Sequence, residues 1–373
     1  MKVIVDDKIP YIRGQVERLA DEVVYLPGSA ITATDVRHAD ALIVRTRTVC
    51  NRQLLQGSRV RFIVTATIGY DHLDTAYLDE AGIAWTNCPG CNATSVAQYV
   101  RNSLLLLEQA DMVDLASATV GIVGMGHVGC AVHEAVSPYV GRIWINDPPL
   151  EQMLGMGHPS ASSTPFCLYN NRRRAQPHQS SQAGMGSSLS FSSLDALMSA
   201  CDIITFHTPL IPDAPHPTFH LAGRQFLDGL RRKPVIINAA RGGVVDDAAL
   251  ECALDDGRVR AAVIDTWEGE PNIRLSLLRK SFIATPHIAG YSANGKANAT
   301  RMSLEALAKW LGKTWDETDA DGFEQPKVCR SAEEDAPQHP LSLYNPMEDS
   351  RRLKQAPERF EYLRGHYPVR YEQ

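Results

Sequence analysis

The chain has 373 residues, of which 44% are hydrophobic and 21% are charged, and its formal net charge is −6 at pH 7. This length allows two or three domains with ordinary hydrophobic cores. The mixed charges offer no basic field for a nucleic acid or a membrane surface, and no apolar run approaches the length of a transmembrane helix. We therefore expect a globular protein that binds neither nucleic acid nor membrane.

The start of the chain leads directly into a predicted strand and shows no signal peptide. Eight cysteines are scattered along the sequence, as expected for reduced thiols in a cytoplasmic protein. Cys88 and Cys91 have C-x-x-C spacing, but the Pro-Gly pair between them is typical of a plain turn. We expect no metal site.

Residues 1–91 alternate short apolar strands with amphipathic segments, which include Tyr11–Ala20 and Leu73–Ala81. Such alternation is typical of a parallel sheet with helices on both faces, so the fold class is α/β. A long helix, Asn92–Gln109, links this first domain to the next. The strands of the first domain are predicted at 2–5, 23–26, 41–45, 62–66 and 83–86.

A glycine-rich turn opens the next domain. The apolar run Val120–Val123 is a predicted strand, and it is followed by G-x-G-x-x-G on Gly124, Gly126 and Gly129, with a helix from about Val128. The first glycine permits the tight turn, the second lets a pyrophosphate approach the backbone, and the third lets helix and strand pack closely. The N–H groups at the helix start, near His127 and Val128, favour a phosphate. The pattern predicts a dinucleotide site.

The acidic residue expected at such a site follows the second strand. Arg142–Asn146 is that predicted strand, and Asp147 comes directly after it, 18 residues after Gly129. A carboxylate there accepts hydrogen bonds from both ribose hydroxyls and repels a 2′-phosphate. The expected cofactor is therefore NAD rather than NADP. The alternative is a glycine-rich turn without a ligand.

Residues 151–190 are rich in Ser, Gly, Gln and Pro, which indicates an insertion or a disordered segment. Regular structure is expected to resume at Ser193, and strands are predicted at 202–206, 235–239, 262–265 and 282–284. A helix follows over 290–311, and its position suggests a return to the first domain. An acidic linker is predicted over 313–340, and an aromatic cluster near the end is too small to fold alone.

Chemically active side chains follow three successive strands of the second domain. Arg241 lies in a glycine-rich turn, Glu268 and Glu270 come after the next strand, and His287 comes after the last. Ligands of open α/β sheets bind beyond the carboxyl ends of the strands, so these side chains can converge there. Each alone would more often be a surface ion pair or a satisfied core group, and the three together favour a catalytic site.

The trio suits the oxidation of a hydroxy acid. Arg241 can grip a carboxylate with two parallel hydrogen bonds. His287 can take the hydroxyl proton as a hydride leaves, and a neighbouring glutamate would stabilise the protonated imidazole. Spacing alone does not decide between Glu268 and Glu270.

The stretches GIVGMGHVG, NAARGGVVD, DTWEGEP and TPHIAGY resemble those of the NAD-dependent D-isomer-specific 2-hydroxyacid dehydrogenases. Within this family the sequence is more similar to the branch that oxidises 4-phospho-D-erythronate in pyridoxal phosphate biosynthesis. The stretches that carry this closer resemblance are MKVIVDDKIPY, TATIGYDHLD, PGCNATSVAQYV, NDPP, TFHTPL and FEYLRGHYPVRYE.

The resemblance implies two Rossmann-like domains with doubly wound parallel sheets and an active site in the cleft, together with a shortened C-terminal dimerisation segment. The substrate domain would comprise 1–91 and 286–312, the NAD domain 92–285, and the linker and dimerisation segment 313–373. The implied partners are a small phosphorylated hydroxy acid and a second copy of the chain.

The resemblance also implies roles for individual residues. The glutamate directly before the proline is the family's choice, which selects Glu270 to act with Arg241 and His287. Cofactor contacts would come from the glycine turn and Asp147, and also from Thr208, Asp265 and Gly290; substrate contacts would come from Thr46, Thr67 and Tyr291.

The substrate phosphate would need cationic partners on the first domain, and the sequence offers two arginines. Arg45 and Arg47 flank Thr46 at a predicted strand end, and Lys296 is a further candidate. If the strand continues through them, the two arginines lie on the same side. The alternative is a pair of arginines that face solvent.

Two other functions fit the same sequence. One is a D-2-hydroxyacid dehydrogenase with a different substrate, such as 3-phosphoglycerate or hydroxypyruvate and glyoxylate. The other is a non-catalytic NAD-sensing protein on the same scaffold. The complete set of Arg241, Glu270 and His287 favours an enzyme over the sensor.

Overall fold

The structure is a computed structural model that describes residues 1–155, 191–213, 215–315 and 339–372. The predicted insertion lies outside the described residues from position 156 onward, as does most of the predicted linker. The chain divides into two compact units. Unit 1 consists of Met1–Asn92, Tyr291–Cys329 and Val369–Gln373, and unit 2 of Ala93–Gly290 and Arg330–Pro368.

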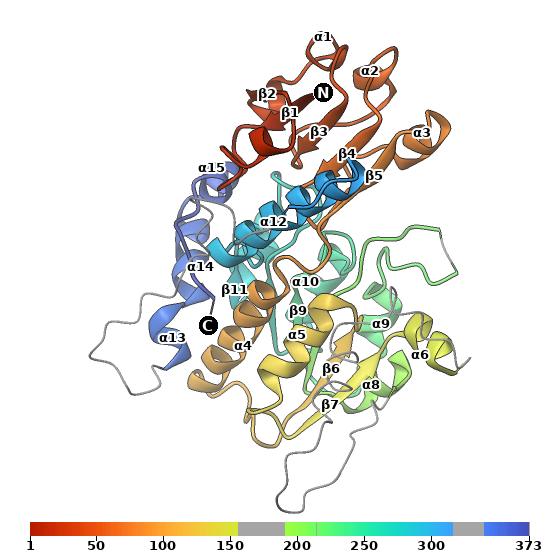
Figure 1. The fold of residues 1–373 in the computed structure, drawn as a ribbon. Helices are drawn as coiled ribbons and strands as arrows, with labels where there is room; N and C mark the ends of the chain where they lie inside the picture. The colour runs from red at the N-terminus through yellow and green to blue at the C-terminus, as the bar shows by residue number, and fades with distance from the viewer. Residues whose placement is uncertain (156–190, 214, 316–338, 373) are drawn as a thin grey trace, which may run out of the picture. The chain divides into compact units, whose positions relative to one another are not determined.

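Unit 1 contains a five-stranded sheet with the order β2-β1-β3-β4-β5 (Figure 1). Every neighbouring pair in it is parallel, as the alternation of strands and helices predicted. The strands ALIV and FIVT are buried along their whole length and are apolar except for Thr65, which is typical of strands covered on both faces. The strands are β1 (Lys2–Asp6), β2 (Glu22–Leu26), β3 (Ala41–Val44), β4 (Phe62–Thr65) and β5 (Ala84–Thr86).

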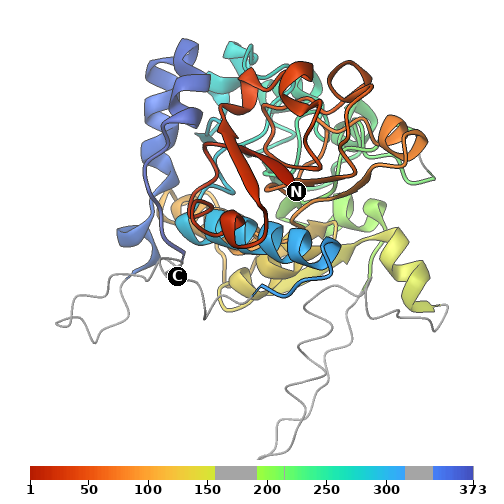
Figure 2. The same ribbon diagram turned by 45° about the horizontal axis from the view of Figure 1, so that its top comes forward.

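Helices cover both faces of this sheet. Val3, Val5 and Ile43 point to one face, where they pack in a core with residues of the long helix α12 (Ala293–Trp310), which returns to the strands of unit 1 (Figures 1 and 2). Ile4 and Leu42 point to the other face and pack with α1 (Ala33–Val36), α2 (Arg52–Leu55) and α3 (Thr75–Glu80). Alternate residues of each strand therefore serve two separate cores.

The helix predicted over Tyr11–Ala20 is wrong for most of its length. The structure has a single 3-10 turn there, η1 (Val16–Arg18). Tyr11 and Gly14 have φ angles of +58° and +81°, in the left-handed region that interrupts an α-helix. The apolar spacing does predict which side chains are buried, since Ile12, Val16 and Leu19 are all in the core. The backbone that carries them, however, follows a series of turns.

Unit 2 contains a six-stranded parallel sheet with the order β11-β10-β9-β8-β6-β7. The chain leaves β6 toward β7 on one side and returns on the other side through β8, so the strand order reverses at β6. In open α/β sheets, such a reversal opens a crevice beyond the carboxyl ends of the strands. The strands are β6 (Thr119–Val123), β7 (Arg142–Asn146), β8 (Ile203–Phe206), β9 (Val235–Asn238), β10 (Ala261–Ile264) and β11 (Ile283–Ala284).

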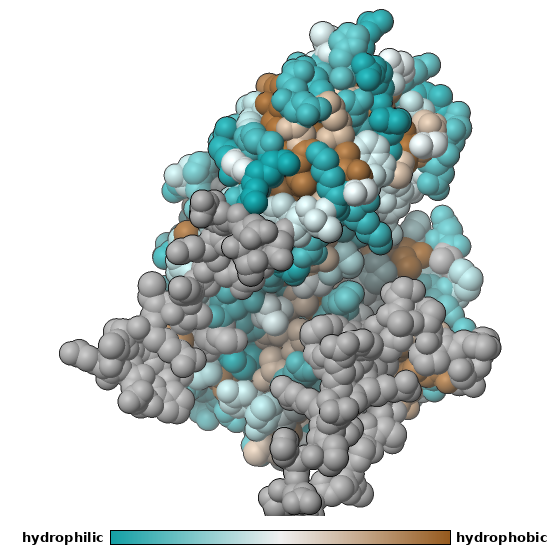
Figure 3. All heavy atoms as spheres, in the orientation of Figure 1, coloured by the Kyte–Doolittle hydropathy of each residue, from teal (hydrophilic) through white to brown (hydrophobic). Residues whose placement is uncertain are grey.

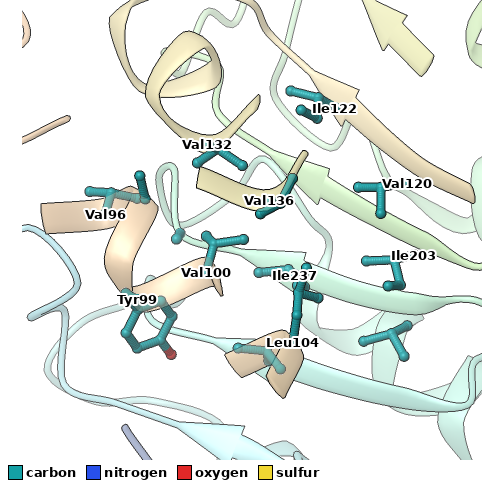
Figure 4. Packing of buried hydrophobic residues seen from close by; sticks show 14 of the residues in the cluster. Val96, Tyr99, Val100, Leu104, Val120, Ile122, Val132, Val136, Ile203 and Ile237 are labelled. Carbon is teal, nitrogen blue, oxygen red and sulfur yellow. The ribbon is translucent and has the colours of Figure 1, made fainter. Parts of the chain in front are cut away.

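The core on one face of this sheet lies beneath two helices. Val100 and Leu104 of α4 (Ala93–Gln109) and Val132 of α5 (His127–Val136) pack over Val120 and other strand residues (Figure 4). The strand residues that alternate with these point to the opposite face of the sheet, where they form a second core. Other helices in the described part of unit 2 before its C-terminal segment are α6 (Pro148–Gly155), α8 (Leu194–Ala200), α9 (Arg224–Asp228), α10 (Asp247–Asp255) and α11 (Leu275–Lys280).

The C-terminal segment packs on unit 2 along its edge strand β11. It forms α13 (Pro340–Leu343), α14 (Pro346–Gln355) and α15 (Phe360–Gly365). The Ser350 hydroxyl accepts a hydrogen bond from the backbone N–H of Ala284 at 3.0 Å, and Leu353 and Phe360 are buried in the same core as Trp267. The segment therefore covers an edge that would otherwise leave backbone groups unpaired.

Hydrophilic residues occupy much of the visible surface of the described chain, with hydrophobic ones in smaller groups (Figure 3). None of the helices in the described ranges combines the length and the apolar character that crossing a bilayer requires.

The space around two glycines of the β6–α5 turn predicts that alanine substitutions there will have different effects on stability. A Cβ on Gly129 would lie 2.0 Å from the carbonyl oxygen of Gly124, whereas a Cβ on Gly126 would have nothing within 4 Å. We expect Gly129→Ala to lower the free energy of unfolding by about 1–3 kcal/mol, because backbone must move. Gly126→Ala, the matched control, should change it by less than about 0.5 kcal/mol. Urea denaturation measures both, and equal stabilities would contradict the close packing.

Candidate active site

The glycine turn of unit 2 has the geometry of a phosphate cradle. Gly124 follows β6 with a φ of +91°, and Gly126 is the N-cap residue of α5. No side chain caps this helix, so the N–H groups at His127 and Val128 point toward the turn without a side-chain acceptor there. The space beside Gly126 is open. An anionic ligand fits the exposed donors and the positive end of the helix dipole.

Asp147 lies at the carboxyl end of β7, beside the same turn. Its Oδ2 accepts a hydrogen bond from the Met125 backbone N–H at 2.8 Å, and its Oδ1 accepts one from Leu150 N–H at 2.9 Å. The carboxylate is therefore fixed next to the glycine turn and also caps α6. Each oxygen retains a lone pair, which leaves acceptors for a pair of ribose hydroxyls.

Thr208 supplies a third sign of a ligand at this edge of the sheet. It follows β8, and its methyl group lies 2.9 Å from where a Cβ of Gly124 would be. Its hydroxyl oxygen is buried and has no hydrogen-bond partner among the described residues. A buried hydroxyl without a partner is costly unless a ligand or a water satisfies it. The residues present therefore fit a bound dinucleotide.

Arg241 follows β9 in a turn braced by Asn238. The Asn238 side-chain amide donates to the carbonyl of Arg241 at 3.1 Å and to that of Thr266 at 3.3 Å, which ties the turn to the next loop. A Cβ on Gly242 would lie 1.9 Å from the carbonyl oxygen of Trp267, so this position requires glycine for close approach. The guanidinium of Arg241 donates to its neighbour's carbonyl, that of Ala240, at 2.8 Å.

His287 and Glu270 form a direct pair. Nδ1 of His287 lies 2.9 Å from Oε2 and 3.1 Å from Oε1 of Glu270. Because a carboxylate only accepts, Nδ1 carries the hydrogen and donates, which leaves Nε2 of the neutral ring as a proton acceptor. The two side chains are 27% and 16% exposed, so the pair is largely removed from water.

The environment of Glu270 keeps its carboxyl group ionised. Burial raises its pKa, but the hydrogen bond and charge of His287, the backbone N–H of Trp267 and the charge of Arg364 act in the opposite direction, and the net pKa lies below the ordinary value. Trp267 N–H donates to Oε1 at 3.0 Å. An ionised Glu270 can hold the imidazole in one orientation and stabilise its protonated form.

Asp265 fixes the loop that carries His287. Its Oδ1 accepts hydrogen bonds from the Thr285 hydroxyl at 2.6 Å and from Ile288 N–H at 2.8 Å, and its Oδ2 accepts one from Ala289 N–H at 2.9 Å. His287 itself has a φ of +57°, a left-handed conformation that must be held by its surroundings. The predicted cofactor residue Asp265 therefore contacts this loop directly, and Gly290, the other, follows Ala289 in the sequence.

Glu268, the alternative that spacing left open, has a different partner. Its carboxylate is hydrogen-bonded to Nε2 of His220, whose Nδ1 lies 3.7 Å from Asp246. The side chains of His220, Asp246 and Glu268 thus lie close together, with one carboxylate at each nitrogen of the His220 ring. The geometry thus pairs Glu270, and not Glu268, with His287.

The predicted substrate residues of unit 1 follow the strands β3 and β4. Arg45, Thr46 and Arg47 form a turn closed by a hydrogen bond from Thr48 N–H to the Arg45 carbonyl at 3.1 Å. The strand ends at Val44, so alternation along a strand does not orient the two arginines. Thr67 follows β4, and its hydroxyl donates to the Gly69 carbonyl at 2.8 Å.

A cluster of cations lies in the same unit. Lys296 of α12 lies 5.5 Å from the ring centre of Tyr291. Burial lowers the pKa of Lys296, and the positive charges of Arg45 and Arg370 lower it further. Arg370 belongs to the last residues of the chain, whose backbone is tied to α12 by a hydrogen bond from Ala293 N–H to the Arg370 carbonyl at 2.7 Å.

Arg364 and Arg370 are not predicted as site residues from the sequence. Both lie in the stretch FEYLRGHYPVRYE, far along the chain from the residues they approach. The one feature of the sequence that could have pointed to these arginines is their position in a C-terminal stretch that resembles the family.

Residues 165–289 match the family described as D-isomer specific 2-hydroxyacid dehydrogenase, NAD binding domain. A protein named erythronate-4-phosphate dehydrogenase from Bacteroides thetaiotaomicron is 45% identical over 100% of this chain and 97% of its own length. A protein with the same name from Escherichia coli is 40% identical over 84% of this chain and 74% of its own length.

Solved structures share the fold. A D-lactate dehydrogenase from Aquifex aeolicus, complexed with NAD and lactic acid, matches with a TM-score of 0.62 at 18% identity, over 84% of this chain and 96% of that one. A formate dehydrogenase from Staphylococcus aureus in complex with NAD matches with a TM-score of 0.61 at 20% identity, over 85% and 98%. The full-length similarity to the Bacteroides relative shows that the chain belongs to the family of D-isomer-specific 2-hydroxyacid dehydrogenases.

Proposed function

We propose that this protein is an NAD-dependent dehydrogenase that oxidises 4-phospho-D-erythronate to 3-hydroxy-2-oxo-4-phosphobutanoate, a reaction of pyridoxal phosphate biosynthesis. The observation that carries the proposal is the His287–Glu270 pair, with Nε2 available as a proton acceptor. Relatives named for this activity, at 45% and 40% identity, support the substrate.

In the proposed mechanism, NAD when bound supplies a hydride acceptor for C2 of the substrate. Arg241 binds the substrate carboxylate through two parallel hydrogen bonds, which orients C2. Nε2 of His287 removes the C2 hydroxyl proton as the hydride leaves. Glu270 accepts from Nδ1 throughout, so the ring keeps its orientation and the imidazolium is stabilised.

The cofactor residues proposed are those around the β6–α5 turn. The turn Gly124, Gly126 and Gly129, with the N–H groups of His127 and Val128, would hold the pyrophosphate. Asp147 would accept from the ribose hydroxyls, and the buried Thr208 hydroxyl would gain a partner. Asp265 and Gly290 would border the nicotinamide end.

The proposed partners of the substrate phosphate are cations of unit 1. The positive charges of Arg45 and Arg370 act on Lys296, so an anion bound beside this lysine would offset their repulsion. Arg47 belongs to the same turn as Arg45. The hydroxyls of Thr46, Thr67 and Tyr291 would contact the rest of the substrate.

We also propose a cytoplasmic homodimer. Among the described cysteines, Cys50, Cys88, Cys91, Cys201 and Cys252 carry free thiols, which is typical of a reducing compartment, whereas Cys130 is disulfide-bonded. Exposed apolar side chains of the C-terminal segment, Leu343 and Tyr362, support this segment as the contact between copies, because such groups often mark an interface.

The substrate is tested by comparing kcat/KM for 4-phospho-D-erythronate, 3-phosphoglycerate and unphosphorylated D-2-hydroxy acids, with NADH absorbance as the readout. Each assay is run with and without a 2-oxo acid, which would reoxidise a cofactor that stays bound. We expect 4-phospho-D-erythronate to exceed the others by at least about tenfold, since a lost charge-assisted contact costs roughly 1.5–3 kcal/mol. A higher value for 3-phosphoglycerate would favour the other dehydrogenase, and no turnover by NAD-loaded protein would favour the sensor.

His287→Gln should lower kcat by roughly 10²–10⁴-fold, because the variant lacks the general base. NAD affinity, measured by calorimetry, should stay the same, since the ring is assigned to the proton and not to the cofactor. His38→Gln, at an exposed position of unit 1, is the control and should retain full activity. Unchanged turnover in His287→Gln would refute the proposed role.

Asp147→Ser should reduce the preference for NAD over NADP, because it removes the charge that repels a 2′-phosphate. Serine keeps a side-chain acceptor at the start of α6, which limits the loss of stability. The readout is the ratio of kcat/KM for the two cofactors, which a general loss of stability does not alter. A ratio equal to that of the unchanged protein would remove Asp147 from the ribose site.

A further inference from the structure

Arg364 lies beside the pair formed by Glu270 and His287, on a helix that has no role in the proposed mechanism. It belongs to α15 in the C-terminal segment of unit 2, and its side chain is 21% exposed. It is 94 residues after Glu270 in the sequence, so no local motif links the two.

The packing of α15 directs Arg364 toward the site. Phe360, four residues earlier, is 1% exposed and lies in the core cluster that contains Trp267. Residues four apart share a helix face, so the buried phenyl ring sets the side on which Arg364 emerges. Tyr362 and Leu363 line a small pocket together with Pro286, the residue before His287. The helix thus shares a pocket with the loop of His287 and a hydrophobic core with the loop of Glu270.

The guanidinium makes an ion pair with the glutamate of the site. Its Nη1 lies 3.5 Å from Oε2 of Glu270, the oxygen that also accepts from Nδ1 of His287 at 2.9 Å. The other carboxylate oxygen accepts from Trp267 N–H at 3.0 Å. One carboxylate oxygen is therefore shared between an arginine and the imidazole.

We propose that Arg364 is a positioning residue of the catalytic pair, which holds Glu270 in place and limits how strongly this carboxylate favours protonated His287. The inference rests on the proposed function, in which neutral His287 is the base. The C-terminal segment of each chain would then contribute a positioning residue to the active site of that same chain.

The charges around the pair give the sign of the effect. Among the described residues, the charged groups that influence Glu270 are His287 from the β11 loop and Arg364 from α15. Glu361, also on α15, lies 3.8 Å from Arg364 and offsets part of its charge. Without Arg364, a nearby positive charge disappears and Glu270 has the imidazole as its remaining cationic partner. The protonated ring then forms more readily.

The test is the pH dependence of kcat/KM for substrate oxidation in Arg364→Gln. Oxidation needs the neutral ring, so activity rises with pH along the acid limb of the profile. We expect this limb to move to higher pH by about 0.5–1 unit, the size of a partly screened charge at this range. In the reverse reaction, which needs the protonated ring, the basic limb should move in the same direction.

Two variants serve as controls. Arg352→Gln removes an arginine from neighbouring α14, where it pairs with Asp349 at 3.6 Å, and should leave the profile unchanged. Arg364→Lys keeps a positive charge and should restore the position of the acid limb to within about 0.3 unit. Should Arg364→Gln fail to fold, Glu361→Gln takes its place and should move the limb slightly to lower pH, because it leaves more of the arginine's charge for Glu270.

A second readout needs no substrate. The ring signal of His287 in labelled protein, identified by its absence from His287→Gln, can be titrated by NMR. A higher midpoint in Arg364→Gln would support the proposal even if the unchanged enzyme did not oxidise 4-phospho-D-erythronate, an outcome that would overturn the proposed function alone. Activity reduced equally at all pH values, with an unmoved midpoint, would overturn the role of Arg364.

Discussion

The hydrogen bond between Nδ1 of His287 and Glu270 is the interaction on which the rest of the site depends. It joins two loops that follow neighbouring strands, β10 and β11, so it exists only while the sheet of unit 2 is intact. Asp265 makes the junction rigid, because its carboxylate binds Thr285 before His287 and the backbone of Ile288 and Ala289 after it, and His287 has a left-handed conformation. The chemistry needs one ring nitrogen occupied and the other open, and this arrangement provides it.

Local patterns predicted the sheet and the residues at its edge. Apolar runs between turns gave the strands, since fully buried parallel strands leave a continuous signal. Arg241, Glu270 and His287 each follow a strand, and parallel strands present such residues at one edge. In the structure His287 is hydrogen-bonded to Glu270, whereas Glu268 is hydrogen-bonded to His220, and these partners depend on side-chain directions that spacing does not encode. The roles of these residues, and the homodimer, stay predictions.

Other features depended on contacts that leave no local pattern. Arg364 reaches Glu270 through the docking of a short helix on the core, and Arg370 reaches the surroundings of Lys296 through the last residues of the chain. Neither contact has a characteristic spacing. The error at Tyr11–Ala20 has the opposite origin: its apolar spacing suits a helix, while Gly14 and Tyr11 adopt backbone angles that no periodicity reveals. Burial was predictable there and conformation was not.

The central claim is that a hydride leaves C2 of 4-phospho-D-erythronate while His287 takes the hydroxyl proton. The most direct measurement uses substrate deuterated at C2 in a single turnover with NAD, followed by denaturation and mass analysis of the released cofactor. We predict one deuterium in the reduced cofactor and none in His287→Gln over the same time. Deuterium released to solvent, or an unlabelled reduced cofactor, would contradict direct transfer and with it the assigned site.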